Sequence, residues 1–261
     1  MRSLDIAGTG MQAQTTNVEV ISNNIANMTT TGFKRRQAEF QDLIYQNLRR
    51  VGSNSSDTGS IVPSGAQVGL GVKTAAIYRI NAQGNLQQTA NTLDMAIQGN
   101  GYFQITLPSG GTAYTRDGTF GLAADGTVVT ADGYTVQPGL QIPSAATGVT
   151  VNTSGQVQVT LSGQTAPTTI GQLQVAVFPN EAGLDAQGAN LFIQTSASGA
   201  PVGGNPGTAG FGTVMQGYLE TSNVNIVTEI TNLITAQRAY EMNSKVITSS
   251  DEMMSTLTNL R

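Results

Sequence analysis

Cysteine, histidine and tryptophan are all absent from the 261 residues of this chain. Without a thiolate or an imidazole, the chain lacks the usual nitrogen and sulfur ligands of zinc, a thiol nucleophile and the base of a Ser-His-Asp triad. Disulfide bonds are impossible for the same reason. We therefore predict no catalytic residue, no cofactor-binding residue and no metal site.

Charge is scarce as well. Charged residues make up 11% of the chain and the net charge is −4 at pH 7, so no basic surface for nucleic acid is expected. No apolar run approaches the roughly 20 residues that cross a bilayer, and the first residues lack the apolar core of a secretory signal. We expect neither a nucleic acid nor a small molecule as the partner.

The N-terminal segment carries a helical pattern. Apolar residues recur there at alternating spacings of three and four, a heptad pattern interrupted only by Gln14. The pattern ends where a Thr run precedes Gly32, which favours a helix stop. The sequence predicts one long amphipathic helix whose inner face comprises Leu4, Ala7, Met11, Gln14, Val18, Ile21, Ile25 and Met28.

The C-terminal segment repeats this pattern. The run SNVN offers Asn223 or Asn225 as an N-cap, and the helix that follows is expected to be about 35 residues long, or about 50 Å. Its inner face comprises Leu233, Ala236, Tyr240, Asn243, Ile247, Ser250, Met254 and Leu257, preceded by Ile226 and Ile230. Two such helices could form an antiparallel hairpin within one chain. The long heptads favour contacts between copies instead, with no role for the ends in a lone molecule.

The middle of the chain changes to a period of two. Val149, Val151, Val157 and Val159 alternate with polar residues around Ser154-Gly155, which predicts a β-hairpin. Asp-Gly pairs at 117, 125 and 132 mark tight turns. The fold class expected is α+β, with discontinuous, coiled-coil-like terminal helices bracketing an antiparallel all-β domain.

These patterns suggest three parts. Residues 1–32 and 221–261 form a terminal helical assembly domain, and 70–220 form the β domain. Residues 33–69 are expected to be a linker or extended segment, with a Ser/Gly-rich loop insert at 50–68.

Two other functions deserve comparison with an assembly role. A carboxylate-based glycan hydrolase needs only two acids, and Asp94 and Glu181 are candidates, but no tryptophan is present to stack on sugar rings. A surface adhesin with a helical stalk is a third possibility, although such stalks seldom use both chain ends. The basic clusters 34–36 and 49–50 are interpreted as a solvated or subunit-facing surface rather than a phosphate site.

Runs at both ends resemble the signatures of the bacterial flagellar rod, hook and hook-associated axial proteins. They are SNNIANMTTTGFKR at 22–35 and LETSNVNIVTEITNLITAQRAYEMNSK at 219–245. The intervening runs GNLQQTANTLDMAIQGNGYFQI and YTRDGTFGLAADGTVVTADGYTVQ resemble the body of the shorter rod members. The resemblance extends over nearly the whole chain.

The resemblance implies a structural role and no enzymatic activity. In this family, terminal helices of many subunits pack around a channel to give a hollow helical polymer. Length and the single β domain favour a distal rod subunit, with a proximal rod or hook-type subunit as the alternative. The implied partners are further copies, the proximal rod and hook proteins, and the surrounding P-ring and L-ring. The implied location is the basal body, from periplasm to outer membrane, reached by type III export without a cleavable signal.

The candidate self-assembly residues combine the heptad positions with residues of the two signatures. They are Leu4, Met11, Val18, Ile21, Asn24, Ile25, Asn27, Gly32, Phe33, Ser222, Asn223, Val224, Asn225, Ile230, Leu233, Gln237, Arg238, Tyr240, Ile247 and Met254.

Overall fold

The computed structural model describes residues 2–49, 64–164 and 166–259. The chain divides into two compact units. The helical unit draws its described residues from 2–25, 36–49, 64–78 and 225–259, and the β unit draws its residues from 26–35, 79–164 and 166–224.

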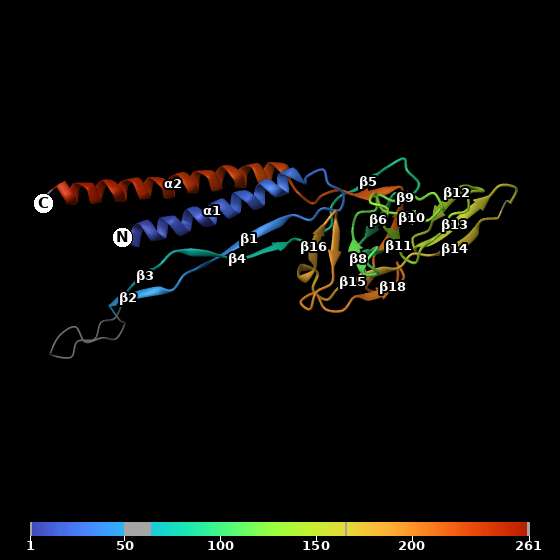
Figure 1. The fold of residues 1–261 in the computed structure, drawn as a ribbon, viewed down its shortest axis with the longest axis horizontal. Helices are drawn as coiled ribbons and strands as arrows, with labels where there is room; N and C mark the ends of the chain where they lie inside the picture. The colour runs from blue at the N-terminus through green and yellow to red at the C-terminus, as the bar shows by residue number, and fades with distance from the viewer. Residues whose placement is uncertain (1, 50–63, 165, 260–261) are drawn as a thin grey trace. The chain divides into compact units, whose positions relative to one another are not determined.

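The helical unit contains two long helices and a narrow β arm (Figure 1). Helix α1 spans Arg2–Ala26 and helix α2 spans Ile226–Asn259. Asn225 caps α2, because its Oδ1 accepts hydrogen bonds from the amides of Val227 and Thr228 at 3.1 and 3.2 Å. Neither helix, over the residues that the structure describes, has the long apolar stretch required to cross a bilayer.

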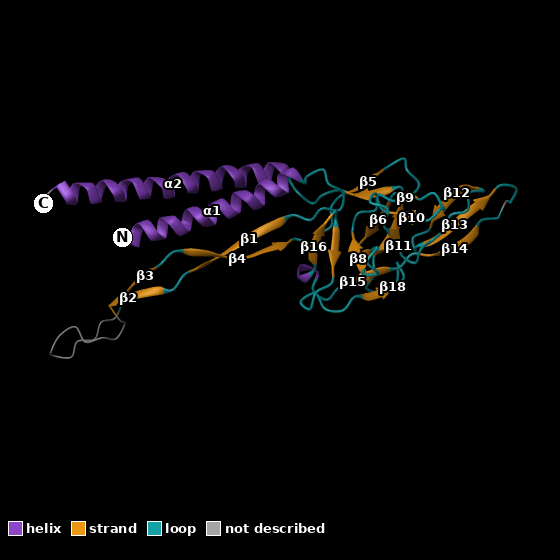
Figure 2. Ribbon diagram, viewed as in Figure 1, coloured by secondary structure: helices purple, strands orange, loops and turns teal. Residues whose placement is uncertain are grey.

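The arm consists of two antiparallel strand pairs that follow one another along the chain (Figure 2). Its first strand, β1, begins at Arg36, and its last, β4, ends at Arg79. The arm lies beside α1, where Thr9 Oγ1 accepts the amide of Val72 at 3.3 Å. Its strands are β1 (Arg36–Asp42) with β4 (Val72–Arg79), and β2 (Tyr45–Arg49) with β3 (Ala66–Gly69).

The arm differs from the predicted boundaries. Strands β1, β2 and β3 occupy described parts of the range expected to be a linker or extended segment, and β4 pairs with β1 instead of opening the β domain at residue 70. The pairing follows from chain connectivity, since two extended segments that leave and return beside one helix satisfy each other's backbone groups. The predicted insert at 50–68 falls outside the described residues at 50–63.

The β unit is antiparallel throughout its described strands, which confirms the predicted fold class. Its main sheet has the path β16-β17-β8-β7-β11-β10-β9, with β15 joining β7 to β18. These strands are β7 (Tyr102–Thr106), β8 (Thr112–Thr115), β9 (Gly121–Leu122), β10 (Val128–Val129), β11 (Thr135–Val136), β15 (Val175–Val177), β16 (Asp185–Gly188), β17 (Leu191–Ile193) and β18 (Val202–Gly204).

Three smaller sheets complete this unit. Each is also antiparallel, and a 3-10 helix at Glu181–Gly183 precedes β16. The sheets are β12 (Ala146–Val151) with β13 (Gln156–Leu161) and β14 (Thr168–Gln172), β19 (Thr213–Gln216) with β6 (Met95–Gln98), and β20 (Tyr218–Glu220) with β5 (Leu86–Gln88).

The alternating pattern read from the sequence reappears in the core. Strands β12 and β13 form the predicted hairpin, with Val149 opposite Val159 and Val151 opposite Val157. Residues Val151, Val157 and Val159 are buried with Phe103 in the main hydrophobic cluster. Two of the three predicted turns are present, since Gly126 and Gly133 follow their aspartates with φ of +81° and +82°. The turn predicted at Asp117-Gly118 is absent; there the chain runs against the backbone of Met95, whose amide donates to the carbonyl of Gly118 at 3.0 Å.

Candidate assembly surface

Helices α1 and α2 pair with each other in antiparallel register. Ser250 Oγ donates to Ser3 Oγ at 3.2 Å, and Asn24 Nδ2 donates to Glu229 Oε2 at 3.1 Å. Between these two contacts Gly10 approaches Asn243, because a Cβ on Gly10 would lie 2.8 Å from Asn243 Nδ2. These three contacts are spaced by seven and then fourteen residues along α1, and by the same numbers in the opposite direction along α2. Such seven-residue spacing is typical of a coiled coil.

This pairing corrects one expectation. We expected the terminal segments to have no role in a lone molecule, which is wrong, because they bind each other within the chain. Their action between copies stays a prediction. The heptad pattern alone could not distinguish the two arrangements, since a helical face is equally apolar against either partner.

The contacts that set the register are small and polar. The face of α2 toward α1 carries Glu229, Ala236 and Ser250, each buried, and the half-buried Asn243. On α1, Gln14 also belongs to the inner face, and its Oε1 is buried without a hydrogen-bond partner among the described residues. The bulky apolar residues of the predicted faces are less completely covered, with Ile21 buried but Tyr240 and Met254 exposed.

The predicted self-assembly residues therefore fall into three groups of exposure. Ile21, Asn24, Gly32 and Ser222 are buried. Asn225, Ile230, Gln237, Arg238, Tyr240 and Met254 are exposed. The half-buried ones are Leu4, Met11, Val18, Ile25, Asn27, Phe33, Asn223, Val224, Leu233 and Ile247.

Asn24 joins three backbone segments of the helical unit. Its Nδ2 donates to the carbonyl of Arg36 at 2.8 Å as well as to Glu229, and its Oδ1 accepts the amide of Arg36 at 2.8 Å. The side chain is almost fully buried. Asn24 therefore connects α1 to the first strand of the arm and to the start of α2.

Asn223 has an equivalent role in the β unit. Its Oδ1 accepts the amide of Arg35 at 2.7 Å, and its Nδ2 donates to the carbonyls of Ile80 and Ala82 at 2.8 and 2.9 Å. Asn223 and Asn24 thus use both ends of their amide groups to fix main chain that is distant in sequence. Residues of both signature runs hold the chain's own segments together.

A cluster of three ionisable side chains lies buried in the β unit. Lys34 Nζ forms an ion pair with Glu220 Oε1 at 2.5 Å, and Arg116 Nε lies 3.1 Å from Glu220 Oε2. Lys34 also donates to the carbonyl of Ala82, and the amide of Gly84 donates to Glu220 Oε1. Burial lowers the pKa of the Lys34 amine, and the adjacent Glu220 carboxylate opposes that shift.

This cluster overturns the interpretation of Lys34 as part of a solvated or subunit-facing basic surface. Its side chain is 2% exposed and paired, whereas sequence reasoning had only three adjacent basic residues to consider. The partner Glu220 lies 186 positions away. No local pattern marks such a pair, so this cluster could not be predicted from the sequence.

Gly32 lies next to this cluster in a backbone conformation that favours glycine. Its φ is +68°, its amide donates to the carbonyl of Glu220 at 2.8 Å, and a Cβ there would lie 2.9 Å from the backbone of Arg116 and Asp117. The backbone of Arg116 and Asp117 packs too closely against Gly32 to admit a side chain.

We expect Gly32→Ala to lower the free energy of unfolding of the β unit by about 3 kcal/mol, because a left-handed penalty adds to a clash with rigid backbone. Gly133→Ala is the matched control, since Gly133 has φ of +82° but nothing within 4 Å of its Cβ position. In the Gly133→Ala control, the free energy of unfolding should fall by only about 1 kcal/mol. Urea unfolding of both variants measures the difference, and equal losses would contradict the close approach.

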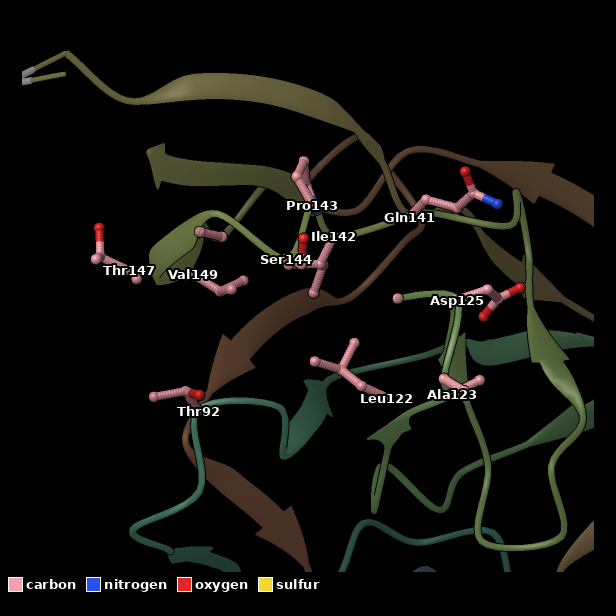
Figure 3. A pocket seen from close by; sticks show the side chains of 14 residues that line it. Thr92, Leu122, Ala123, Asp125, Gln141, Ile142, Pro143, Ser144, Thr147 and Val149 are labelled. Atoms are coloured by element: carbon pink, nitrogen blue, oxygen red, sulfur yellow. The ribbon is translucent and has the colours of Figure 1, made fainter. Parts of the chain in front are cut away.

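The β unit also contains an open hollow, of about 810 Å³ (Figure 3). Residues 122–126, 141–144 and 146–149 line it together with Thr92, and Asp125 is the one ionisable side chain among the 14 lining residues. Hydrogen bonds from Thr127 lower the pKa of Asp125 below its ordinary value. A single ionised carboxylate in an open hollow does not provide the acid and base that glycan hydrolysis requires.

The carboxylates considered for hydrolysis have other roles. Asp94 is buried and accepts hydrogen bonds from Thr89 Oγ1 at 2.7 Å and Asn91 Nδ2 at 2.9 Å. Glu181 accepts the Tyr102 hydroxyl at 3.1 Å, and burial is the main cause of the raised pKa of that tyrosine. The described residues contain no group of three His, Cys, Asp or Glu side chains that could hold a metal ion.

Paired terminal helices joined to an antiparallel β unit are the arrangement expected of an axial structural protein, and comparison with known proteins agrees. Three family descriptions match the chain: "Flagella basal body rod protein" at 4–34, "Flagellar hook protein FlgE/F/G D1 domain" at 96–159, and "Flagellar basal body rod FlgEFG protein C-terminal" at 215–260.

Relatives match over nearly their full length. The chain is 58% identical to the flagellar basal-body rod protein FlgG of Caulobacter vibrioides, covering 100% of both chains. It is 56% identical to FlgG of Agrobacterium fabrum, over 98% of this chain and 97% of that protein, and 39% identical to FlgG of Bacillus subtilis, over 100% and 99%. The chain belongs to the FlgG family of flagellar basal-body rod proteins.

Proposed function

We propose that the chain is a subunit of the distal rod, which self-assembles into a hollow helical shaft that transmits torque to the hook. The proposal includes export without a cleavable signal, a position from the periplasm to the outer membrane, and contacts with proximal rod and hook proteins inside the P-ring and L-ring. It also assigns the chain no catalytic role.

The observation that carries this proposal is apolar surface left uncovered in the helical unit. On α2, Val227 is 71% exposed and Met242 67% exposed, and on the arm Ile44 is 81% exposed. Exposed apolar side chains that gather along one element, rather than scattering singly, mark contact surfaces. Further copies of a chain that builds a filament would supply the missing cover.

The arm supports the same proposal. The pair β2 and β3 is an isolated two-stranded ribbon in the described chain, and such ribbons are marginal in water without further packing. Tyr45 and Leu48, which are also more than half exposed, add to the apolar surface of this ribbon. Burial against neighbouring subunits would stabilise the ribbon in the assembled rod.

We expect the full-length chain to restore swimming and complete rods in cells that lack their own distal rod subunit. Ile247→Asp should be exported but should leave the rod incomplete, because the charge falls on the half-buried face of α2. Thr248→Asp, on the exposed side of the same turn, is the control and should still build rods. Electron microscopy of isolated basal bodies measures rod length. If complete rods form but do not contain the unmodified chain, the proposal is refuted.

A further inference from the structure

Three segments of the β unit that are distant in sequence bind one another. They are residues 30–35, 80–88 and 217–223, which together we call the latch. The second and third pair as strands β5 and β20, with Glu220 opposite Leu86. The latch therefore joins the beginning of the β unit's chain to a middle segment and to its end.

Hydrogen bonds from main-chain amides connect each segment of the latch to the other two. The amide of Gly32 donates to the carbonyl of Glu220 at 2.8 Å, and the amide of Ile80 donates to the carbonyl of Arg35 at 2.8 Å. The amide of Gly84 donates to Glu220 Oε1 at 2.9 Å. Because every segment supplies partners to both of the others, loss of one segment would leave polar groups unpaired in the remaining two.

Apolar burial contributes little to the latch. Its fully buried residues are Gly32, Lys34, Glu220 and Ser222, none of which has a large apolar side chain. Among the described residues of the β unit, those that form the two hydrophobic clusters all lie outside the latch. A region with few buried apolar contacts opens at a lower free energy than a packed core does. The latch is therefore expected to be less stable than the main sheet.

We propose that the latch opens and closes as one cooperative unit while the main sheet stays folded. Opening separates Lys34 and Arg116 from Glu220 and returns these charges to water, which solvates them well. The main sheet keeps its own hydrophobic cluster in this state, because none of that cluster belongs to the latch. The β unit then has two folded states, one with the latch closed and one with it open.

Closure of the latch requires a nearly complete chain. The strands of the main sheet all lie between residues 102 and 204, so this sheet can form before residues 217–223 have been synthesised. The latch cannot close at that stage, because Lys34 and the amide of Gly32 have their partner in Glu220. The last part of the β unit to be made thus completes the contacts of the first part.

The latch also lies between the two terminal helices in the chain. Helix α1 ends at Ala26, shortly before the latch begins, and α2 begins at Ile226, shortly after it ends. A closed latch holds both ends of the β unit's chain side by side at Gly32 and Glu220, and an open latch releases them. We therefore expect a copy to be competent for assembly only when its latch is closed. This consequence rests on the proposed function, whereas the opening itself does not.

Hydrogen exchange of the purified full-length chain, in urea below the unfolding transition, measures the two openings separately. The latch amides of Gly32, Gly84 and Thr221 should share one protection factor, at least about tenfold below that of the amides in β7 and β8. Their exchange should also depend less on urea, because opening the latch exposes less surface than unfolding the sheet. One protection factor and one urea dependence for both sets of amides would overturn the proposal.

Two substitutions distinguish a latch from a general loss of stability. Ile105→Val removes a methyl group from the main hydrophobic cluster and should speed exchange in β7 and β8 about 2- to 10-fold, while the latch amides keep their rates. Glu220→Gln should speed exchange of the latch amides at least about 100-fold, because two buried cations lose their counter-ion. Equal acceleration of both sets of amides by Ile105→Val would show that the sheet and the latch unfold together.

The same variants test the consequence for assembly, in cells that depend on this chain for their rod. We expect Ile105→Val in isolated basal bodies at nearly the amount of the unmodified chain, and Glu220→Gln at a several-fold lower amount. Adding Lys34→Met to Glu220→Gln removes one unpaired cation and should recover part of both the latch protection and the incorporation. Equal incorporation of Ile105→Val and Glu220→Gln would contradict a role of the latch in assembly. Rods that lack even the unmodified chain would refute the proposed function and leave the exchange measurement unaffected.

Discussion

Glu220→Gln is expected to lower the free energy of unfolding of the β unit by about 3 to 5 kcal/mol. The carboxylate of Glu220 faces both Lys34 and Arg116, and all three side chains are buried. The amide keeps the shape of the side chain but removes its charge, which leaves two buried cations without a counter-ion. An uncompensated charge in a protein interior is far more costly than the loss of one neutral hydrogen bond.

Lys34→Met is the informative comparison. It removes one cation and leaves Glu220 balanced by Arg116, whose guanidinium also donates to the carbonyls of Gly101 and Gly99 at 2.6 and 2.9 Å. The loss should be smaller, about 1 to 3 kcal/mol. Adding Lys34→Met to Glu220→Gln should then recover part of the stability lost by Glu220→Gln alone.

Urea unfolding followed by tyrosine fluorescence measures these variants, since Tyr102 and Tyr114 are buried in the β unit. A Glu220→Gln variant within about 1 kcal/mol of the unmodified chain would contradict the assignment of Glu220 as the counter-ion of two buried cations.

Asn24→Ala is expected to destabilise the helical unit by about 3 kcal/mol. The substitution removes three hydrogen bonds and leaves the amide and carbonyl of Arg36 and the Glu229 carboxylate without the partner that the side chain of Asn24 provides. The greater helix propensity of alanine offsets only about 0.5 kcal/mol of this loss. The pairing of α1 with α2 should weaken first where the C-terminal end of α1 meets the N-terminal end of α2.

Hydrogen exchange of the α1 and α2 amides measures the effect locally, and far-UV circular dichroism measures it globally. Ser22→Ala is the control, because Ser22 is an exposed residue on the same helix and its replacement should change stability by less than about 0.5 kcal/mol. Faster exchange confined to the Asn24→Ala variant is the expected result. Equal protection in the two variants would show that Asn24 does not hold the helix pair.

The same two asparagines illustrate what a signature run can and cannot reveal. Resemblance selected Asn24 and Asn223 as assembly residues, yet in the single chain each joins main-chain segments of its own unit. In the proposed rod we expect these two asparagines to contribute indirectly, because they hold the main chain near the end of α1 and before the start of α2. The exposed apolar residues of α2 present their side chains outward instead, and the sequence selected Ile230, Tyr240 and Met254 among them.

The sequence by itself determined the elements: two long helices from heptad spacing, the β12–β13 hairpin from alternation, and the turns at 125–126 and 132–133 from their Asp-Gly pairs. These are local patterns, and their periods follow from backbone geometry. The tertiary structure alone decided that α1 pairs with α2, that the segment after Gly32 forms an arm, and that Lys34 meets Glu220. These three features depend on which segments, distant in sequence, come into contact. The periodicity of apolar residues shows that a face is buried but not which segment covers it.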